Sequence, residues 1–147
     1  MKKLSLIILF LISNLAIAED IPTLATHINK TPNWQNDNAE IVYVGTRCSG
    51  VLDAVIWRFG DDTRPEMANN KVMAQQMGDT FLFSSAAIAE KINFSKEGYT
   101  KEYKYWMEFY MAEAKDNLKK NNNIFEGLLG SDFNTCKENI GFYQSLL

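Results

Sequence analysis

Residues 41–59 read IVYVGTRCSGVLDAVIWRF, and this stretch decides the fold. Its apolar positions recur at intervals of three and four, so on a helix they fall within about 100° of one another. Valine and isoleucine would also suit a strand, but the spacing is not the alternation that a strand requires. We therefore predict an amphipathic helix that ends at Gly60. Its apolar stripe comprises Ile41, Val44, Cys48, Val51, Leu52, Val55 and Phe59.

A second helix is predicted from the residues that follow. Thr63 and Glu66 have the spacing of a capping box, and Pro65 occupies a first-turn position where its missing N–H costs nothing. Apolar residues keep one face from there to about residue 93. Residues 78–80, a Gly-Asp-Thr sequence, could interrupt the segment. The sequence leaves open whether residues 64–93 form one helix or two.

Two more helices complete the predicted domain, residues 40–147. The clearest covers about residues 99–121, and the last begins at Ser131 or Asp132, one of which we expect to cap it. The fold class is therefore all-α, a bundle of four or five helices. Residues 19–39 contain two prolines and many polar residues with little periodicity. We predict that they form an irregular N-terminal arm.

The first 18 residues have the layout of a cleavable signal peptide. Lys2 and Lys3 precede an apolar run, which ends at Ala16-Ile17-Ala18 before acidic residues. The run is shorter than the roughly 20 residues that a spanning helix needs, although an uncleaved anchor helix is the alternative. We predict cleavage near Ala18, a periplasmic or secreted protein, and no transmembrane anchor after cleavage.

Cys48 and Cys136 are the two cysteines of the chain, and both lie on predicted core-facing stripes. Export to an oxidising compartment favours a disulfide between them, with two buried free thiols as the alternative. The bond would join the first helix of the bundle to the last. Because it closes a long loop, it would stabilise the fold by about 4 to 5 kcal/mol on the chain-entropy model.

Composition argues against several classes of function. The formal net charge is −3 and no run of basic residues forms a stripe, so we expect no nucleic-acid partner. The single histidine, His27, lies in the predicted arm as an exposed residue, and a disulfide would remove both thiols. We therefore predict no catalytic residue and no cofactor. A carboxylate-based cell-wall hydrolase is the third-ranked alternative, because the acidic residues at helix starts are explained by capping.

Four aromatic residues lie off the core stripes: Trp57 and Tyr43 on the first helix, Tyr105 and Phe109 on the third. They could contact a second neighbour within the bundle, or an arm carrying Trp34 could fold over them. Large rings also dominate the energetics of protein interfaces. Our leading hypothesis is a non-enzymatic protein that binds a periplasmic or cell-envelope protein through these side chains.

Two pairs of methionines have the spacing i, i+4 on predicted helices. The pairs are Met73 with Met77 and Met107 with Met111. Thioethers are soft ligands that suit Cu(I), so a periplasmic carrier of Cu(I) or of a small ligand is the second hypothesis. The competing interpretation is that these side chains fill gaps in the core.

Three features together resemble a known group of proteins. They are YVGTRCSG at residues 43–50, the aromatic-rich helix, and DFNTC at residues 132–136. The chain resembles uncharacterised small exported helical proteins of marine bacteria and their phages, loosely over most of its mature length. The resemblance implies export and the pairing of the two cysteines. It transfers no catalytic or binding residue.

Overall fold

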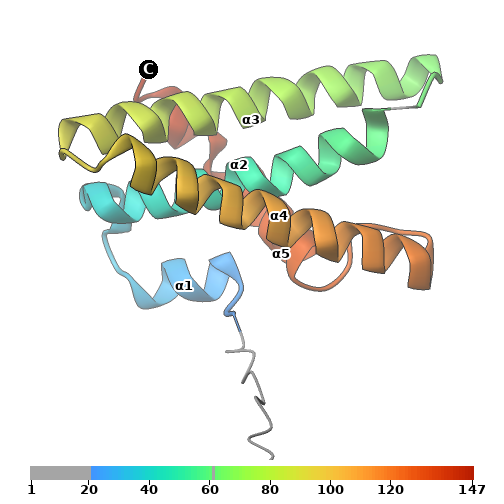
Figure 1. Cartoon of the computed structure of the whole chain (residues 1–147), viewed down its shortest axis with the longest axis horizontal. Coiled ribbons are helices and arrows are strands. Elements are labelled where there is room, and N and C mark those ends of the chain that lie inside the picture. Colours follow the sequence, from blue (N-terminus) through green and yellow to red (C-terminus); the bar gives the residue numbers. More distant parts are fainter. Residues whose placement is uncertain (1–20, 61) are drawn as a thin grey trace, which may run out of the picture.

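The computed structural model describes residues 21–60 and 62–147, and every regular element in this part of the chain is a helix. The prediction of an all-α bundle is therefore confirmed. The predicted signal peptide lies outside the described residues. Figure 1 shows the elements, which in chain order are α1 (Leu24–Lys30), the short 3-10 helix η1 (Trp34–Asn36), α2 (Asn38–Gly60), α3 (Pro65–Lys91), α4 (Lys96–Asn121) and α5 (Gly127–Gln144).

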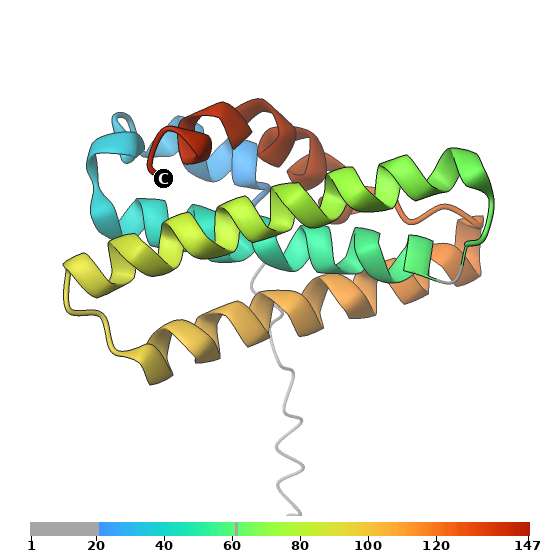
Figure 2. The same cartoon turned by 90° about the horizontal axis from the view of Figure 1, so that it is seen from above.

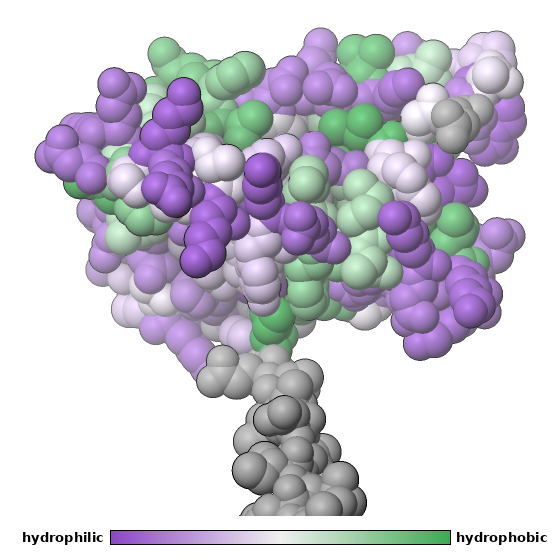
Figure 3. Space-filling view, in the orientation of Figure 1, coloured by the Kyte–Doolittle hydropathy of each residue, from purple (hydrophilic) through white to green (hydrophobic). Residues whose placement is uncertain are grey.

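Helix α2 is the centre of the bundle, as its long apolar stripe requires. It contacts α3, α4, α5 and η1, and Figure 2 shows it running between α4 and α5. Val44, Val51 and Leu52 of its stripe are completely buried. On the face shown in Figure 3, polar side chains predominate and apolar ones are interspersed among them. Within the described residues, no helix has both the length and the hydropathy needed to cross a membrane.

Two glycines of α2 allow its neighbours to approach closely. A Cβ on Gly50 would lie 2.6 Å from the backbone carbonyl carbon of Trp106 on α4. A Cβ on Gly45 would lie 2.4 Å from Cβ of Ser85 on α3. Both distances are too short for a real Cβ atom. Helices α3 and α4 can therefore pack this closely against α2 only because these two residues are glycines.

The predicted disulfide is confirmed. Sγ of Cys48 on α2 lies 2.04 Å from Sγ of Cys136 on α5, and both residues are fully buried. The two apolar stripes therefore face each other in the core, as the helical phasing predicted. The bond joins the central helix of the bundle to the last one.

The prediction of an irregular N-terminal arm is wrong for residues 21–39, the part of the arm that the structure describes. These residues contain α1 and η1, and Leu24 and Trp34 belong to the buried core. Helix α1 has only seven residues, too few to show periodicity or to be stable alone, so tertiary contacts hold it. Trp34 does not fold over the off-stripe aromatics; it packs against Phe142, with ring centroids 5.3 Å apart.

The structure answers the question of one helix or two for residues 64–93. Helix α3 is continuous from Pro65 to Lys91, because Gly78 lies against α2 and tertiary packing overrides its low helix propensity. Pro65 occupies the first position as predicted. The capping box is wrong, since the helix is capped at Arg64 with no side-chain hydrogen bond.

The predicted start of the last helix is also wrong. Helix α5 begins at Gly127, four residues before Ser131, and Asp132 is a fully buried residue inside it. The cap comes from another helix: Oε1 of Glu113 on α4 accepts a hydrogen bond of 3.0 Å from the backbone N–H of Leu129. A capping group so distant in the chain leaves no local pattern to detect.

Candidate functional site

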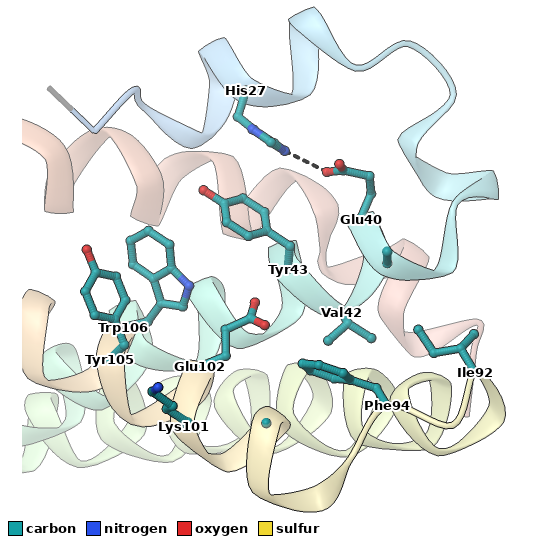
Figure 4. A pocket seen from close by; sticks show the side chains of 12 residues that line it. His27, Glu40, Val42, Tyr43, Ile92, Phe94, Lys101, Glu102, Tyr105 and Trp106 are labelled. Atoms are coloured by element: carbon teal, nitrogen blue, oxygen red, sulfur yellow. Dashed lines mark hydrogen bonds and ion pairs between the residues drawn. The ribbon is translucent and has the colours of Figure 1, made fainter. Parts of the chain in front are cut away.

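A groove of about 610 Å³ lies between α1, the first turns of α2 and the first half of α4 (Figure 4). The loop between α3 and α4 closes one end of it. Its lining is mostly apolar, although His27, Glu40, Lys101 and Glu102 are among the twelve lining residues. The lining residues are His27, Ala39, Glu40, Val42, Tyr43, Ile92, Phe94, Gly98, Lys101, Glu102, Tyr105 and Trp106.

Aromatic rings form the inner walls of the groove. Tyr43 of α2 and Trp106 of α4 meet edge to face, with centroids 5.7 Å apart. Tyr105 extends the wall toward solvent; its ring lies 4.9 Å from that of Trp106, and the residue is 51% exposed. Phe94, from the α3–α4 loop, is 38% exposed at the opposite wall. The groove therefore offers ring surface on both sides.

A contact between His27 and Glu40 lies at the α1 side of the groove. Nε2 of His27 lies 2.6 Å from Oε2 of Glu40, and each side chain is 25% exposed. The His27 ring also packs on Tyr43, with centroids 4.5 Å apart. The prediction of an exposed histidine in an irregular arm is therefore corrected: His27 lies on α1 and faces α2. This pair fixes the edge of the groove that α1 provides.

Glu102 of α4 carries a half-buried carboxylate into the groove (Figure 4). Oγ1 of Thr46 donates a hydrogen bond of 3.0 Å to its Oε1. Burial raises the pKa of this carboxyl group above its ordinary value, and the bond from Thr46 opposes that rise. Lys101, also on the lining, is exposed. The ion pairs found among residues 21–60 and 62–147 include neither Glu102 nor Lys101.

A buried network of charged and hydroxyl groups lies beneath the groove. Arg47 and Asp132 are fully buried and form an ion pair of 2.5 Å between Nη2 and Oδ2. Tyr110 donates its hydroxyl hydrogen to Asp132, and Nε of Arg47 donates to the Tyr110 oxygen at 2.8 Å. Burial opposes the charge on Arg47, but Tyr110 and Asp132 raise the pKa of the guanidinium above its ordinary value. The arginine is therefore charged.

The same network orients the groove walls. Nη1 of Arg47 donates a 2.8 Å hydrogen bond to the hydroxyl of Tyr43. The guanidinium carbon lies 4.7 Å from the ring centroid of Trp106, a cation–π contact. Burial raises the pKa of the Tyr43 phenol, and Arg47 opposes this. The two innermost rings are thus held by one buried cation.

Helix α1 is anchored by the network as well. Nη2 of Arg47 donates to the backbone oxygen of Pro22 at 2.7 Å, and the backbone N–H of Leu24 donates to Oδ1 of Asp132 at 2.6 Å. These bonds bind the start of α1 to α2 and α5. Arg47 and Cys48 are adjacent in the chain, so the disulfide and the ion pair secure the same crossing of α2 over α5.

The predicted partner surface is divided by the fold. Tyr43 and Tyr105 both line the groove, and Phe109 stacks beside Tyr105 with centroids 6.3 Å apart. Trp57 lies 14 residues beyond Tyr43 on α2, about 21 Å along the helix axis. There it lines a separate hollow with Leu118 and neighbours. The structure brings three of the four aromatics together and places Trp57 at the other end of the bundle.

The methionine pairs lie on different helices. Met73 and Met77 of α3 line a shallow pocket of about 160 Å³ together with Gln144 of α5. Met107 and Met111 are half-buried on α4 and do not line that pocket. Within the described ranges, no group of three or more His, Cys, Asp or Glu side chains could hold a metal ion. A Cu(I) site at the methionines stays a prediction.

Sequence reasoning missed the residues that give the groove its chemistry. Glu102 gave no signal, because its partner Thr46 is 56 positions away. Trp106 is only 5% exposed, yet its remaining surface forms a wall of the groove. Arg47 could have been found, since a cation within the apolar sequence of the central helix requires a buried counter-ion.

Comparisons of the chain with protein-family models, curated proteins and solved structures give no match. The function has to be argued from the site itself.

Proposed function

We propose that this is an exported binding protein. In this proposal the segment up to about Ala18 is removed as a signal peptide, and the remaining chain acts in the periplasm or outside the cell. It binds another protein of the periplasm or cell envelope through the aromatic groove. The observation that carries the proposal is an open groove whose aromatic walls are fixed from beneath by a buried ion pair.

Two physical arguments support a protein partner. Interfaces gain most of their affinity from a few aromatic or arginine anchors in well-packed surroundings, and Tyr43, Tyr105 and Trp106 supply such rings. Rings already held in place lose little conformational freedom when a partner arrives, so less of the interaction energy is lost in ordering them. Arg47 holds Tyr43 and Trp106 in this way.

The test is a crosslinking pull-down from the native periplasm with matched aromatic variants. Tyr105→Ala removes a groove ring that is half exposed, and Trp57→Ala removes an exposed ring from the other end of α2. We expect Tyr105→Ala to reduce recovery of the partner at least tenfold, and Trp57→Ala to leave it unchanged. Equal recovery with both variants, or loss with Trp57→Ala alone, would refute the groove as the binding site.

Carriage of a small ligand is a second candidate, favoured by the size of the groove. Its volume of about 610 Å³ lies within the range of small-molecule sites, roughly 300 to 1,000 Å³. Native mass spectrometry of the protein purified from its own periplasm distinguishes this role. A bound molecule that is retained by Trp57→Ala and lost in Tyr105→Ala would support it, and a ligand-free mass would count against it.

A further inference from the structure

We propose that the groove recognises a lysine side chain of the partner protein, with its ammonium group bound at the carboxylate of Glu102. This inference rests on the proposed function, since it names the chemistry that the same groove selects. It starts from one feature that the fold does not require. Glu102 brings a carboxylate into a mostly apolar groove where it has no cationic partner among the described residues.

The hydrogen bonding of Glu102 leaves room for a donor. Among the described residues, Thr46 is the donor found for this carboxylate, and it binds Oε1. Oε2 is free to accept a hydrogen bond from a ligand. Burial raises the pKa of the Glu102 carboxyl group, because its surroundings disfavour the charged form. An ammonium group at Oε2 would donate a hydrogen bond to this oxygen and place a positive charge beside the carboxylate.

The walls of the groove suit the rest of a lysine side chain. The faces of aromatic rings attract cations, and Trp106, Tyr43 and Tyr105 lie around the entrance to Glu102. The methylene groups of lysine can pack along apolar side chains such as Val42 and Phe94, which line the same groove. A chain with an apolar stem and a cationic end therefore matches both parts of the site.

Three other lining residues have side chains that can carry a charge: His27, Glu40 and Lys101. Glu40 already contacts His27, with 2.6 Å between Oε2 and Nε2, whereas no such contact is found for Glu102 among the described residues. Lys101 is exposed and forms no ion pair with Glu102, so it does not neutralise the site from within. The chain as a whole carries a formal net charge of −3. The negative net charge of the chain favours the approach of a basic segment over an acidic one.

Peptide titration of the isotopically labelled mature protein, followed by NMR, tests the inference. The probes are an acetylated, amidated pentapeptide with a central lysine flanked by leucine and alanine, the same peptide with norleucine in place of lysine, and n-butylammonium. The variants are Glu102→Gln and, as a matched control on the exposed side of α4, Glu108→Gln. Glutamine keeps an oxygen that can accept from Thr46 and removes the charge.

We expect the lysine peptide to shift groove resonances and to bind about tenfold more tightly than the norleucine peptide. Glu102→Gln should abolish that difference, Glu108→Gln should preserve it, and n-butylammonium alone should bind at least tenfold more weakly than the lysine peptide. Equal binding of the two peptides, or an unchanged preference in Glu102→Gln, overturns the inference while leaving the pull-down result intact. Equal binding of n-butylammonium overturns the choice of a protein lysine, and absence of groove shifts with every probe overturns the ammonium site.

Discussion

The buried ion pair between Arg47 and Asp132 matters for stability because each charge depends on the other. Both side chains are fully buried, and Tyr110, Tyr43 and two backbone groups complete their hydrogen bonds. Replacing such a pair with apolar residues can be neutral, but removing one member leaves an uncompensated charge in the core. The network therefore fixes the geometry of the groove walls at the cost of sensitivity to single substitutions.

Asp132→Asn should lower the free energy of unfolding by about 3 to 5 kcal/mol, because Arg47 then stays buried without a counter-ion. Urea unfolding monitored by circular dichroism measures this. Asp116→Asn is the control: Asp116 pairs with Lys120 on the exposed side of α4, and its loss should change stability by less than about 1 kcal/mol. If the two variants unfold at the same urea concentration, the buried network does not stabilise the fold more than an exposed ion pair does.

The charge on Glu102 should lower the stability of the fold, whereas the charge on Asp132 should raise it. Its folded-state pKa is raised by burial, so the folded protein binds this proton more tightly than the unfolded chain does. The ionised group therefore lowers stability at neutral pH, and this penalty disappears as the pH falls below the ordinary pKa of the carboxyl group.

Glu102→Gln should accordingly raise the melting temperature at pH 7 and leave it unchanged at pH 3.5, below the ordinary pKa of the carboxyl group. Scanning calorimetry of the variant and of Glu108→Gln at both pH values measures this. A lower melting temperature for Glu102→Gln at pH 7 would show that the carboxylate serves the fold rather than a ligand.

At the scale of the helices, the periodicity of the sequence predicted those helices that have long apolar stripes. Helices α2 and α4 and the facing of Cys48 and Cys136 follow from spacing alone, because each stripe must be buried. The short α1 and the start of α5 could not be predicted this way. Their stabilising groups, Asp132 for α1 and Glu113 for α5, lie on other helices.

The crossing of α2 and α4 offers a test at this scale. Gly50→Ala would place a Cβ 2.6 Å from the Trp106 backbone, which cannot move without shifting α4. We expect a loss of about 2 to 3 kcal/mol, together with a changed near-ultraviolet circular dichroism spectrum from Trp106.

Gly141→Ala is the matched control for this substitution, because Gly141 is an exposed residue of α5 with open space around its Cβ position. It should gain up to about 1 kcal/mol from better helix propensity. Equal effects of the two substitutions on unfolding would mean that α2 and α4 do not depend on the close approach at Gly50.

In the whole molecule, the disulfide and the buried network secure one region, and Arg47 of this network contacts the groove residues Tyr43 and Trp106. The sequence predicted the disulfide and two of the groove rings, Tyr43 and Tyr105, from composition and helical phase. It could not predict the groove, because its walls come from residues that are distant in the chain and meet only through packing. Trp57 illustrates this limit. The helical periodicity predicted which face of α2 carries its side chain, but it could not predict which residues surround that side chain.

Site-specific photocrosslinking in intact cells tests the central claim, that this groove binds a protein, most directly. Benzoylphenylalanine replaces Ala39, an exposed residue that lines the groove. As the control, it replaces Val72, an exposed residue of α3 that lies about 30 Å along the helix axis from Ile92, another lining residue of the groove. We predict one discrete adduct from position 39, lost when Tyr105→Ala is added, and none from position 72. No adduct at position 39, or the same adduct from both positions, would contradict the claim.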